Sequence, residues 1–255
     1  MNAYNDIGID SQLDWKRIRK LLMIGVFAAV MVLVGDLLLG YGVEDEALSG
    51  LERSLSRYIA RSDAVLFWSS LLGVIGIPLE CLCWFGIYRL IASRSQRYAH
   101  IYRSGILGCL TFGGCGVHLP CLAAVYVYKH MLTVSPEHAY DIVLQFAEYF
   151  LLPGTILFFI FFAVLCYAQI AAFSRGLTPY PKWCWVFSLP IPMLLVLLLH
   201  KLVGNVAWAH GLATGWINIG NLWMFGGLLV MLERVKRVSE PQARKDDAGR
   251  STDDV

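Results

Sequence analysis

The stretch that decides the fold is residues 20–41, KLLMIGVFAAVMVLVGDLLLGY, in which one charged residue, Asp36, interrupts the apolar run after Lys20. Because the hydrocarbon core of a bilayer is ~30 Å thick and a helix rises 1.5 Å per residue, ~20 apolar residues make one crossing. Five further stretches have this length and character, at 64–92, 104–128, 142–173, 183–203 and 206–232. The sequence therefore predicts an all-α, polytopic bundle of six membrane-spanning helices over residues 20–233.

The composition agrees with a membrane protein and excludes other classes. Hydrophobic residues make up 57 % of the chain and charged residues only 16 %, with a mean hydropathy of +0.58. Soluble globular domains carry close to a quarter of charged residues, and disordered chains carry few apolar ones. No P-loop, no dinucleotide-binding glycine pattern and no basic face with interleaved aromatic residues is present, so neither a cofactor nor a nucleic-acid partner is expected.

The distribution of Lys and Arg predicts the orientation, because positively charged loops stay in the cytoplasm. With the N-terminus inside, sixteen Lys and Arg fall on the cytoplasmic side and five on the other. Residues 1–19 are then a cytoplasmic N-terminal segment, and the polar residues 234–255 a disordered cytoplasmic tail. Both termini are expected on the same side, as an even number of crossings requires.

A segment between the first two crossings has the pattern of a short helix lying on the outer interface. Within residues 44–62, Leu48, Leu51, Leu55 and Ile59 recur at steps of three and four, with Ser and Arg between them. Such spacing makes an amphipathic helix. The segment is either a lid over a site or a passive interfacial helix, and the pattern leaves both open.

Ionisable side chains occur inside the predicted crossings, where they are expensive unless they face the bundle interior and have partners. Several of them lie on polar stripes at helical spacing, such as the line Ser69, Gly73, Gly76 and Glu80. We therefore expect one shared polar cavity, opening toward the outer side. The residues expected in it are Asp36, Glu80, His118, Glu148, His210, Asn218 and Asn221, with the deep aromatic residues Trp84, Trp216 and Trp223.

Carboxyl and imidazole groups in a low-dielectric site are suited to general acid–base chemistry. We assign Glu80 and Glu148 as acid and base, with Asp36 and His118 orienting them. His210, Asn218 and Asn221 are then expected to hold a polar head group, and the Trp faces to stabilise positive charge in a carbocation. The expected function is a membrane-embedded enzyme that isomerises or cyclises a lipid, sterol or isoprenoid-like substrate.

Three alternatives stay open at this stage. Buried carboxyl groups also serve as proton relays or cation sites in transporters. A metal-dependent membrane hydrolase would need His118, His210, Asp36 and Glu148 to meet through tertiary contacts, because no local pair of metal ligands is present. A scaffold protein would use the buried polar groups only to set helix register.

Short motifs along the chain resemble a known family. These are Val34-Gly35-Asp36-Leu37-Leu38, the run from Leu72-Gly73-Val74-Ile75-Gly76 to Tyr88, and His118. Together they resemble a bacterial family of six-pass membrane proteins that is known only as a domain of unknown function. The resemblance implies a bacterial cytoplasmic (inner) membrane setting and no particular activity.

Overall fold

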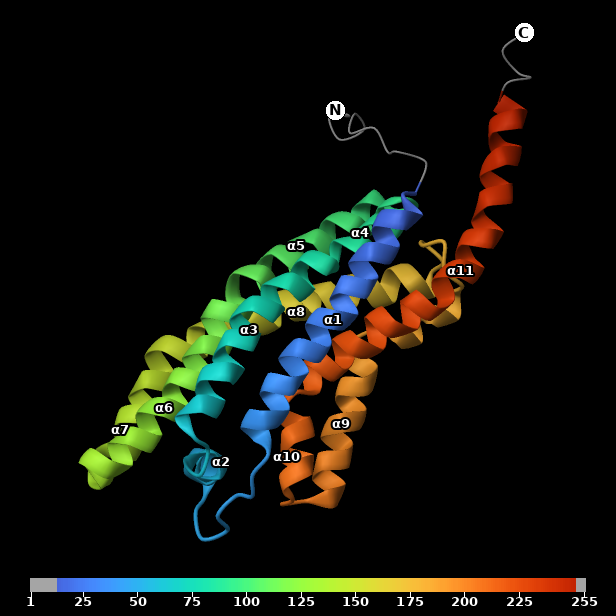
Figure 1. Cartoon of the computed structure of the whole chain (residues 1–255). Helices are drawn as coiled ribbons and strands as arrows, with labels where there is room; N and C mark the ends of the chain where they lie inside the picture. Colours follow the sequence, from blue (N-terminus) through green and yellow to red (C-terminus); the bar gives the residue numbers. More distant parts are fainter. Residues whose placement is uncertain (1–12, 251–255) are drawn as a thin grey trace.

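The structure is a computed structural model that describes residues 13–250, with the backbone alone for residues 239–250. Every regular element in this part of the chain is helical (Figure 1). In chain order the elements are α1 (Trp15–Gly40), α2 (Gly50–Ile59), α3 (Asp63–Cys83), α4 (Phe85–Ala92), α5 (Gln96–Phe112), η1 (Gly113–His118), α6 (Leu119–Val134), α7 (Pro136–Phe146), η2 (Ala147–Leu151), α8 (Leu152–Ser174), η3 (Lys182–Phe187), α9 (Pro190–Val203), α10 (Ala207–Thr214) and α11 (Trp216–Arg250).

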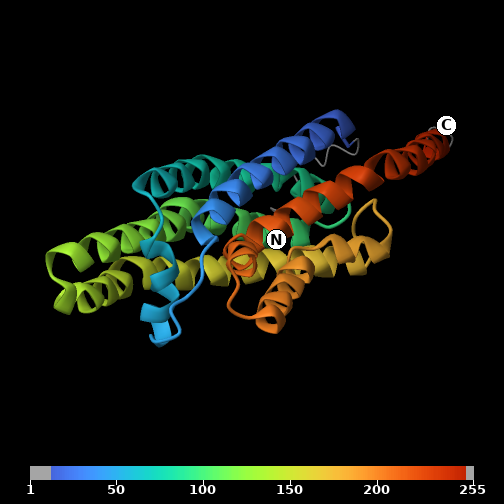
Figure 2. The same ribbon diagram turned by 60° about the horizontal axis from the view of Figure 1, so that its bottom comes forward.

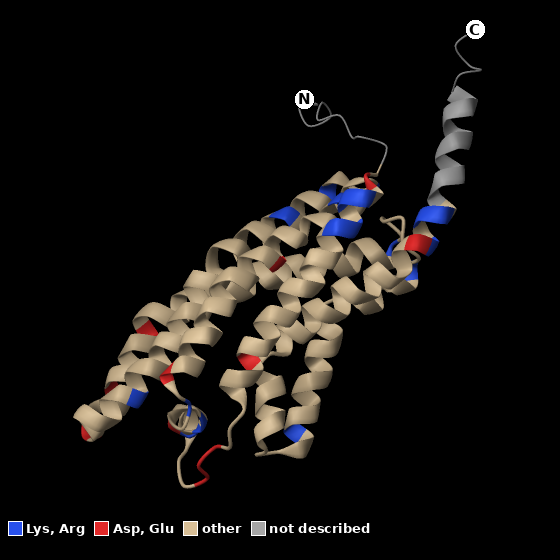
Figure 3. Ribbon diagram, in the orientation of Figure 1, with Lys and Arg blue, Asp and Glu red and all other residues tan. Residues whose placement is uncertain are grey.

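Four helical segments are long and apolar enough to cross a membrane, so the architecture is that of a multi-pass membrane bundle. They are Trp15–Gly40, Asp63–Ala92, Gln96–Val134 and Pro136–Ser174. Figure 3 agrees with this interpretation, because charged positions gather toward the two ends of the bundle and few lie between them. The prediction of an all-α chain is confirmed for the described residues, and their long apolar helices are compatible with a membrane bundle.

The last two predicted crossings differ from single straight helices. The stretch 183–203 is divided into the 3₁₀-helix η3 and the 14-residue helix α9. Pro190 is the first residue of α9, a position where proline is favoured and where it limits any continuation of the helix upstream. The stretch 206–232 is broken at Gly215, and the two parts, Ala207–Thr214 and Trp216–Val238, are bent by 63°.

The bundle is organised around α1, which packs against α3 on one side and against α10 and α11 on the other, while α5 packs along α8 (Figures 1 and 2). Close approach to α10 depends on Gly40, because a Cβ there would lie 2.2 Å from Oγ1 of Thr214. A fully buried core joins α1, α4, α5, α8 and α11 through side chains such as Leu22, Tyr102, Leu165 and Phe225.

The short helix predicted within 44–62 forms as α2, over Gly50–Ile59, but its apolar stripe is only partly buried. Leu55 is 7 % exposed, whereas Leu51 is 40 % and Ile59 37 % exposed. The helix is therefore held by one buried apolar residue, Leu55, together with polar contacts of its other residues.

The predicted terminal segments are tested only in part. Residues 1–12 and 251–255 lie outside the described part of the chain. The helix α11 continues to Arg250, past the predicted boundary at residue 234. The disorder predicted for residues 234–255 stays a prediction. Residue types with good helix propensity, including Ala, Arg, Lys and Gln, are frequent there and favour this continuation.

Candidate active site

A cavity of about 260 Å³ lies inside the bundle, and most of the residues predicted for the site line it. Its walls come from α1, α2, α3, η1, α6, α8, α10 and α11, so no single helix builds it. The predicted residues that line the cavity are Asp36, Glu80, Trp84, His118, Trp216, Asn218 and Asn221. The expected convergence of polar groups therefore holds for seven of the ten residues.

The central polar contact is a chain from Trp84 through Asn221 to Glu80. The indole N–H of Trp84 donates to Oδ1 of Asn221 over 3.0 Å, and Nδ2 of Asn221 donates to Oε2 of Glu80 over 3.0 Å. An indole N–H only donates, so Asn221 must turn its oxygen toward Trp84 and its NH₂ toward Glu80. All three side chains are at most 2 % exposed.

The other carboxylate oxygen of Glu80, Oε1, is buried and has no hydrogen-bond partner in the described part of the chain. Oε2 is already an acceptor for Asn221. A neutral Glu80 would therefore carry its proton on Oε1. Oε1 is therefore the atom that carries the proton when Glu80 is neutral, and Glu80 lines the cavity.

Asp36 is bound in the same way by Asn218, which lies three residues before Asn221 on α11. Nδ2 of Asn218 donates to Oδ2 of Asp36 over 2.6 Å, and Asp36 is 6 % exposed. Residues three apart on a helix lie one above the other, about 5–6 Å apart at Cβ. Asn218 and Asn221 thus bring the two carboxyl groups to adjacent positions along α11. Among the described residues that line the cavity, none is Lys or Arg.

His118 enters the cavity wall from the last residue of the π-helix η1. One of its ring nitrogens, Nε2, lies 3.0 Å from the backbone oxygen of Ser69, which only accepts, so Nε2 carries a proton. The ring lies over Gly73, where a Cβ would come within 1.9 Å of Nε2. The predicted line Ser69, Gly73, Gly76 and Glu80 is buried throughout, as expected.

In the sequence, Ser104, Thr111 and His118 recur at steps of seven, which predicts that they share one face of a regular α-helix. The structure contradicts this stripe. Both hydroxyl groups are on exposed residues and donate within their own helix, to the carbonyl oxygens of His100 and Leu107. The prediction assumed a regular α-helix, but η1 lies between Thr111 and His118. A π-helical turn contains additional residues and rotates everything after it about the helix axis.

Glu148, His210 and Trp223 are not among the residues that line the cavity, so the structure does not bring them together with the other seven. Glu148 is exposed on the second π-helix, η2, so the same change of phase turns it outward. Trp223 is 46 % exposed and donates to the backbone oxygen of Val186. His210 is buried, but the 63° break at Gly215 separates it from the face that carries Asn218 and Asn221.

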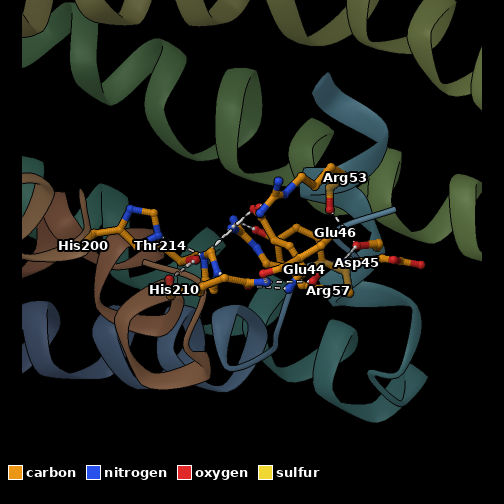
Figure 4. Close-up of polar contacts among 11 residues, drawn as sticks. Glu44, Asp45, Glu46, Arg53, Arg57, His200, His210 and Thr214 are labelled. Carbon is orange, nitrogen blue, oxygen red and sulfur yellow. Dashed lines mark hydrogen bonds and ion pairs between the residues drawn. The ribbon is translucent and has the colours of Figure 1, made fainter. Parts of the chain in front are cut away.

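His210 belongs instead to a second polar cluster, between α2, α9 and α10 (Figure 4). Nη1 of Arg57 lies 3.0 Å from Nδ1 of His210 and donates to Oε1 of Glu44 over 3.2 Å. Nε2 of His200 lies 3.0 Å from the same Nδ1, and Nε2 of His210 lies 2.9 Å from Oδ1 of Asn205. The sequence analysis named His210 but not its partners, which come from separate segments.

The predicted set of metal ligands is divided between these places. His118 and Asp36 line the cavity, whereas His210 and Glu148 do not. Among residues 13–238, whose side chains the structure describes, no group of three or more His, Cys, Asp or Glu side chains is arranged to hold a metal ion.

Tyr58, Thr214 and Cys121 also line the cavity and were not predicted. The hydroxyl of Tyr58 accepts from Nη2 of Arg57 over 2.6 Å. Burial, the largest effect, raises the pKa of Tyr58 above its ordinary value, and the neighbouring Arg57 acts in the opposite direction. Tyr58 lies outside the apolar stripe of α2 in the sequence, so periodicity gives no signal for it.

Comparison with known proteins places the chain in a family. Residues 4–235 match a family described as a family of unknown function, DUF6796. The chain belongs to this family. The resemblance to an uncharacterised family is thereby confirmed. No curated protein and no solved structure matches the chain.

The DUF6796 match covers every residue of the cavity but carries no activity with it. What the arrangement can do is therefore argued from its chemistry. Two carboxyl groups, each bound by one amide, share an apolar and aromatic chamber with one imidazole. Such a chamber can hold a proton on one carboxyl group and a negative charge on the other.

Proposed function

We propose that this cavity is the active site of a membrane-embedded enzyme that isomerises or cyclises a lipid, sterol or isoprenoid-like substrate by proton transfer. Glu80 is the proton donor in this proposal, with Oε1 as the donating atom. The observation that carries it is the chain Trp84–Asn221–Glu80, which satisfies Oε2 and leaves Oε1 buried without a partner. A buried carboxylic acid kept neutral by its surroundings is a competent proton donor.

The second carboxyl group, Asp36, takes the part of proton acceptor in place of Glu148. Two like charges one helical turn apart in an apolar chamber repel, so one of the two groups keeps a proton. Asp36 is the group with the short 2.6 Å bond from Asn218, and a hydrogen bond that donates to a carboxylate is stronger than one between neutral groups. Ionised Asp36 beside neutral Glu80 is the resting state of the proposed site.

An apolar substrate is supported by the walls of the cavity. Phe158 and Phe159 of α8 and Trp216 of α11 line it, and the rings of Phe159 and Trp216 are 6.4 Å apart. Phe159 is also 40 % exposed, on a segment apolar enough to cross a membrane, so this wall reaches the outer surface of the bundle. A substrate dissolved in the bilayer would meet that wall first.

Aromatic faces and a carboxylate are also the groups that stabilise positive charge in a chamber without water. Protonation of a carbon–carbon double bond by Oε1 of Glu80 forms a C–H bond and leaves a carbocation next to ionised Asp36. Loss of a proton from a neighbouring carbon to Asp36 restores a double bond at a new position. The sum is an isomerisation that moves one proton from Glu80 to Asp36 with no net change of charge. Return of that proton between the two adjacent carboxyl groups restores the resting state.

The experiment compares the lipids of a host that carries the wild-type chain with those of hosts carrying Glu80→Gln or Glu148→Gln. Both changes remove one acidic group, but only Glu80 lines the cavity. We expect one apolar compound to accumulate with Glu80→Gln and not with Glu148→Gln, at equal amounts of protein. Equal lipid profiles for the wild type and Glu80→Gln would contradict the enzyme. A flux of protons or cations in liposomes that Glu80→Gln abolishes, with lipids unchanged, would replace it with transport.

For the membrane setting we propose six crossings, with both termini in the cytoplasm of a bacterial cell and the bundle in its inner membrane. The excess of Lys and Arg on one side supports the orientation. The fifth crossing is the critical one, because α9 alone is about 21 Å long at 1.5 Å per residue. Reporter fusions at residues 178 and 204 should lie on opposite sides of the membrane; the same side for both would remove this crossing.

A further inference from the structure

The helix α2 contributes to the cavity although it lies outside the candidate membrane spans. Its residue Tyr58 is part of the cavity wall, next to Leu39 of α1 and Thr214 of α10. Nη2 of Arg57, the preceding residue, donates to the hydroxyl of Tyr58. The orientation of Tyr58 is thus coupled to Arg57, which itself points to the second polar cluster (Figure 4).

The contacts of Arg57 cross from α2 to α10. A guanidinium group only donates, so Nδ1 of His210 accepts from Nη1 of Arg57 and carries no proton. The proton of His210 is therefore on Nε2, which donates to Oδ1 of Asn205. Nε2 of His200 lies 3.0 Å from the same Nδ1, so His200 and Arg57 share the single lone pair of that nitrogen.

A second crossing contact ties the loop before α2 to the loop before α10. The backbone N–H of Glu44 donates to Oδ1 of Asn205 over 2.8 Å, and Nδ2 of Asn205 donates to the backbone oxygen of Glu44 over 2.9 Å. The carboxylate of Glu44 in turn accepts from Arg57, and the two side chains are 14 % and 15 % exposed. We call Glu44, Arg57, His200, Asn205 and His210 the latch.

The apolar packing of α2 is with α1, α3 and α6, on the side away from α9 and α10. Leu55 and Tyr58 belong to a cluster with Leu39, Leu66 and Leu122. Leu55 is the buried residue of this helix, and Gly50, at φ +58°, begins it. Segments with few buried apolar contacts open locally at low cost, well before the whole protein unfolds. The latch is accordingly the main attachment of α2 to the α9–α10 side of the molecule.

We propose that α2 is a lid on the cavity, that the latch holds it closed, and that Tyr58 is the hydroxyl group that the closed lid presents to a bound ligand. The part played by Tyr58 rests on the proposed function, because it requires a ligand in the cavity. The lid and the latch do not. Opening α2 removes Tyr58 from the wall and exposes the polar chamber between Asp36 and Glu80.

The test measures access to the cavity through its cysteines. Cys81 lines the cavity and is 1 % exposed, Cys109 is equally buried but does not line it, and Cys115 is exposed. The full chain in lipid nanodiscs is treated with a small water-soluble methanethiosulfonate reagent, and peptide mass spectrometry follows each cysteine separately. Amide hydrogen exchange over residues 44–60 is recorded in parallel.

Arg57→Gln removes the guanidinium that bonds His210, Glu44 and Tyr58, and Arg53→Gln is its matched control. Arg53 also lies on α2 and bonds Glu44, but its contact stays within the lid segment. Hydrogen bonds from a charged group are stronger than neutral ones, so we expect roughly a tenfold or greater increase in modification of Cys81 with Arg57→Gln. Exchange over residues 44–60 should rise with it, whereas Cys109, Cys115 and the Arg53→Gln protein should keep their wild-type rates.

An unchanged rate at Cys81 in Arg57→Gln, or equal increases in the two arginine variants, would overturn the lid. If Arg57→Gln also raises modification of Cys109, the protein has loosened as a whole. The variant His210→Gln is then tested in its place, and the lid requires faster modification of Cys81 with no change at Cys109. These readouts do not depend on catalysis. A lid that responds as expected while Glu80→Gln leaves the lipids unchanged would separate this proposal from the proposed function.

Discussion

Asn221 on α11 donates its side-chain amide to Glu80 on α3 over 3.0 Å, across 141 positions of sequence. The same amide accepts from Trp84, which removes its freedom to rotate by 180°. One neutral side chain thereby determines which oxygen of Glu80 is satisfied and which remains available. Four predictions follow the same kind of reasoning from individual contacts.

Replacing Asn221 with Leu is expected to leave two buried groups, the indole N–H of Trp84 and Oε2 of Glu80, without their partner. Each unsatisfied group costs about 1–3 kcal/mol, so the free energy of unfolding should fall by roughly 2–6 kcal/mol. Unfolding in mixed detergent measures it. Trp84→Phe in the Asn221→Leu background should then cost less than in the wild type, and strictly additive losses would contradict the coupling.

Gly73→Ala is expected to displace the ring of His118, because the new Cβ would lie 1.9 Å from its Nε2. Overpacking of this kind costs about 1–3 kcal/mol. In a His118→Ala protein the obstacle is gone, and Gly73→Ala should become neutral or slightly stabilising, since Ala is the better helix former. Thermal unfolding of the four proteins is sufficient. The same loss in both backgrounds would show that His118 is not the contact that matters.

Long-chain amines are expected to bind more tightly than alcohols of the same chain length. The proposed resting site offers ionised Asp36 and the rings of Trp84 and Trp216, and no Lys or Arg lines the described cavity. A close charge and aromatic contacts together favour the ammonium by at least tenfold in affinity. Calorimetry with dodecylamine and dodecanol measures the ratio. Asp36→Asn should bring the ratio of the two affinities near one. Equal affinities for the amine and the alcohol in the wild type would mean that the chamber is not negative.

Tyr58 is expected to make stability decrease at alkaline pH. Burial raises its pKa in the folded protein above the value near 10 of an unfolded tyrosine. Its contribution to stability is thus fully present below that value and is lost as the pH rises through the higher pKa of the folded state. Between pH 9 and 11 the wild type should lose more free energy of unfolding than Tyr58→Phe. Parallel losses for the two proteins would argue against a buried Tyr58.

Part of the candidate site follows from sequence alone. Hydrophobic runs require helices, because backbone groups in hydrocarbon must be satisfied within the segment. Costly polar residues in those runs must then face inward. This reasoning identified Asp36, Glu80, His118, Asn218 and Asn221, and the line on α3 was regular enough for the spacing of 100° per residue to hold.

The tertiary structure decided which polar residues share a chamber. The phase of a helix is kept only while the helix is regular, and η1, η2 and the break at Gly215 each change it, which places Glu148 and His210 elsewhere. Tyr58 reaches the cavity from a helix outside the bundle, through contacts with Arg57 that no local pattern contains. The hydrophobicity of each segment determined that it is helical, and the cost of polar groups in hydrocarbon determined that they face inward. The packing of distant segments determined which of these residues became neighbours.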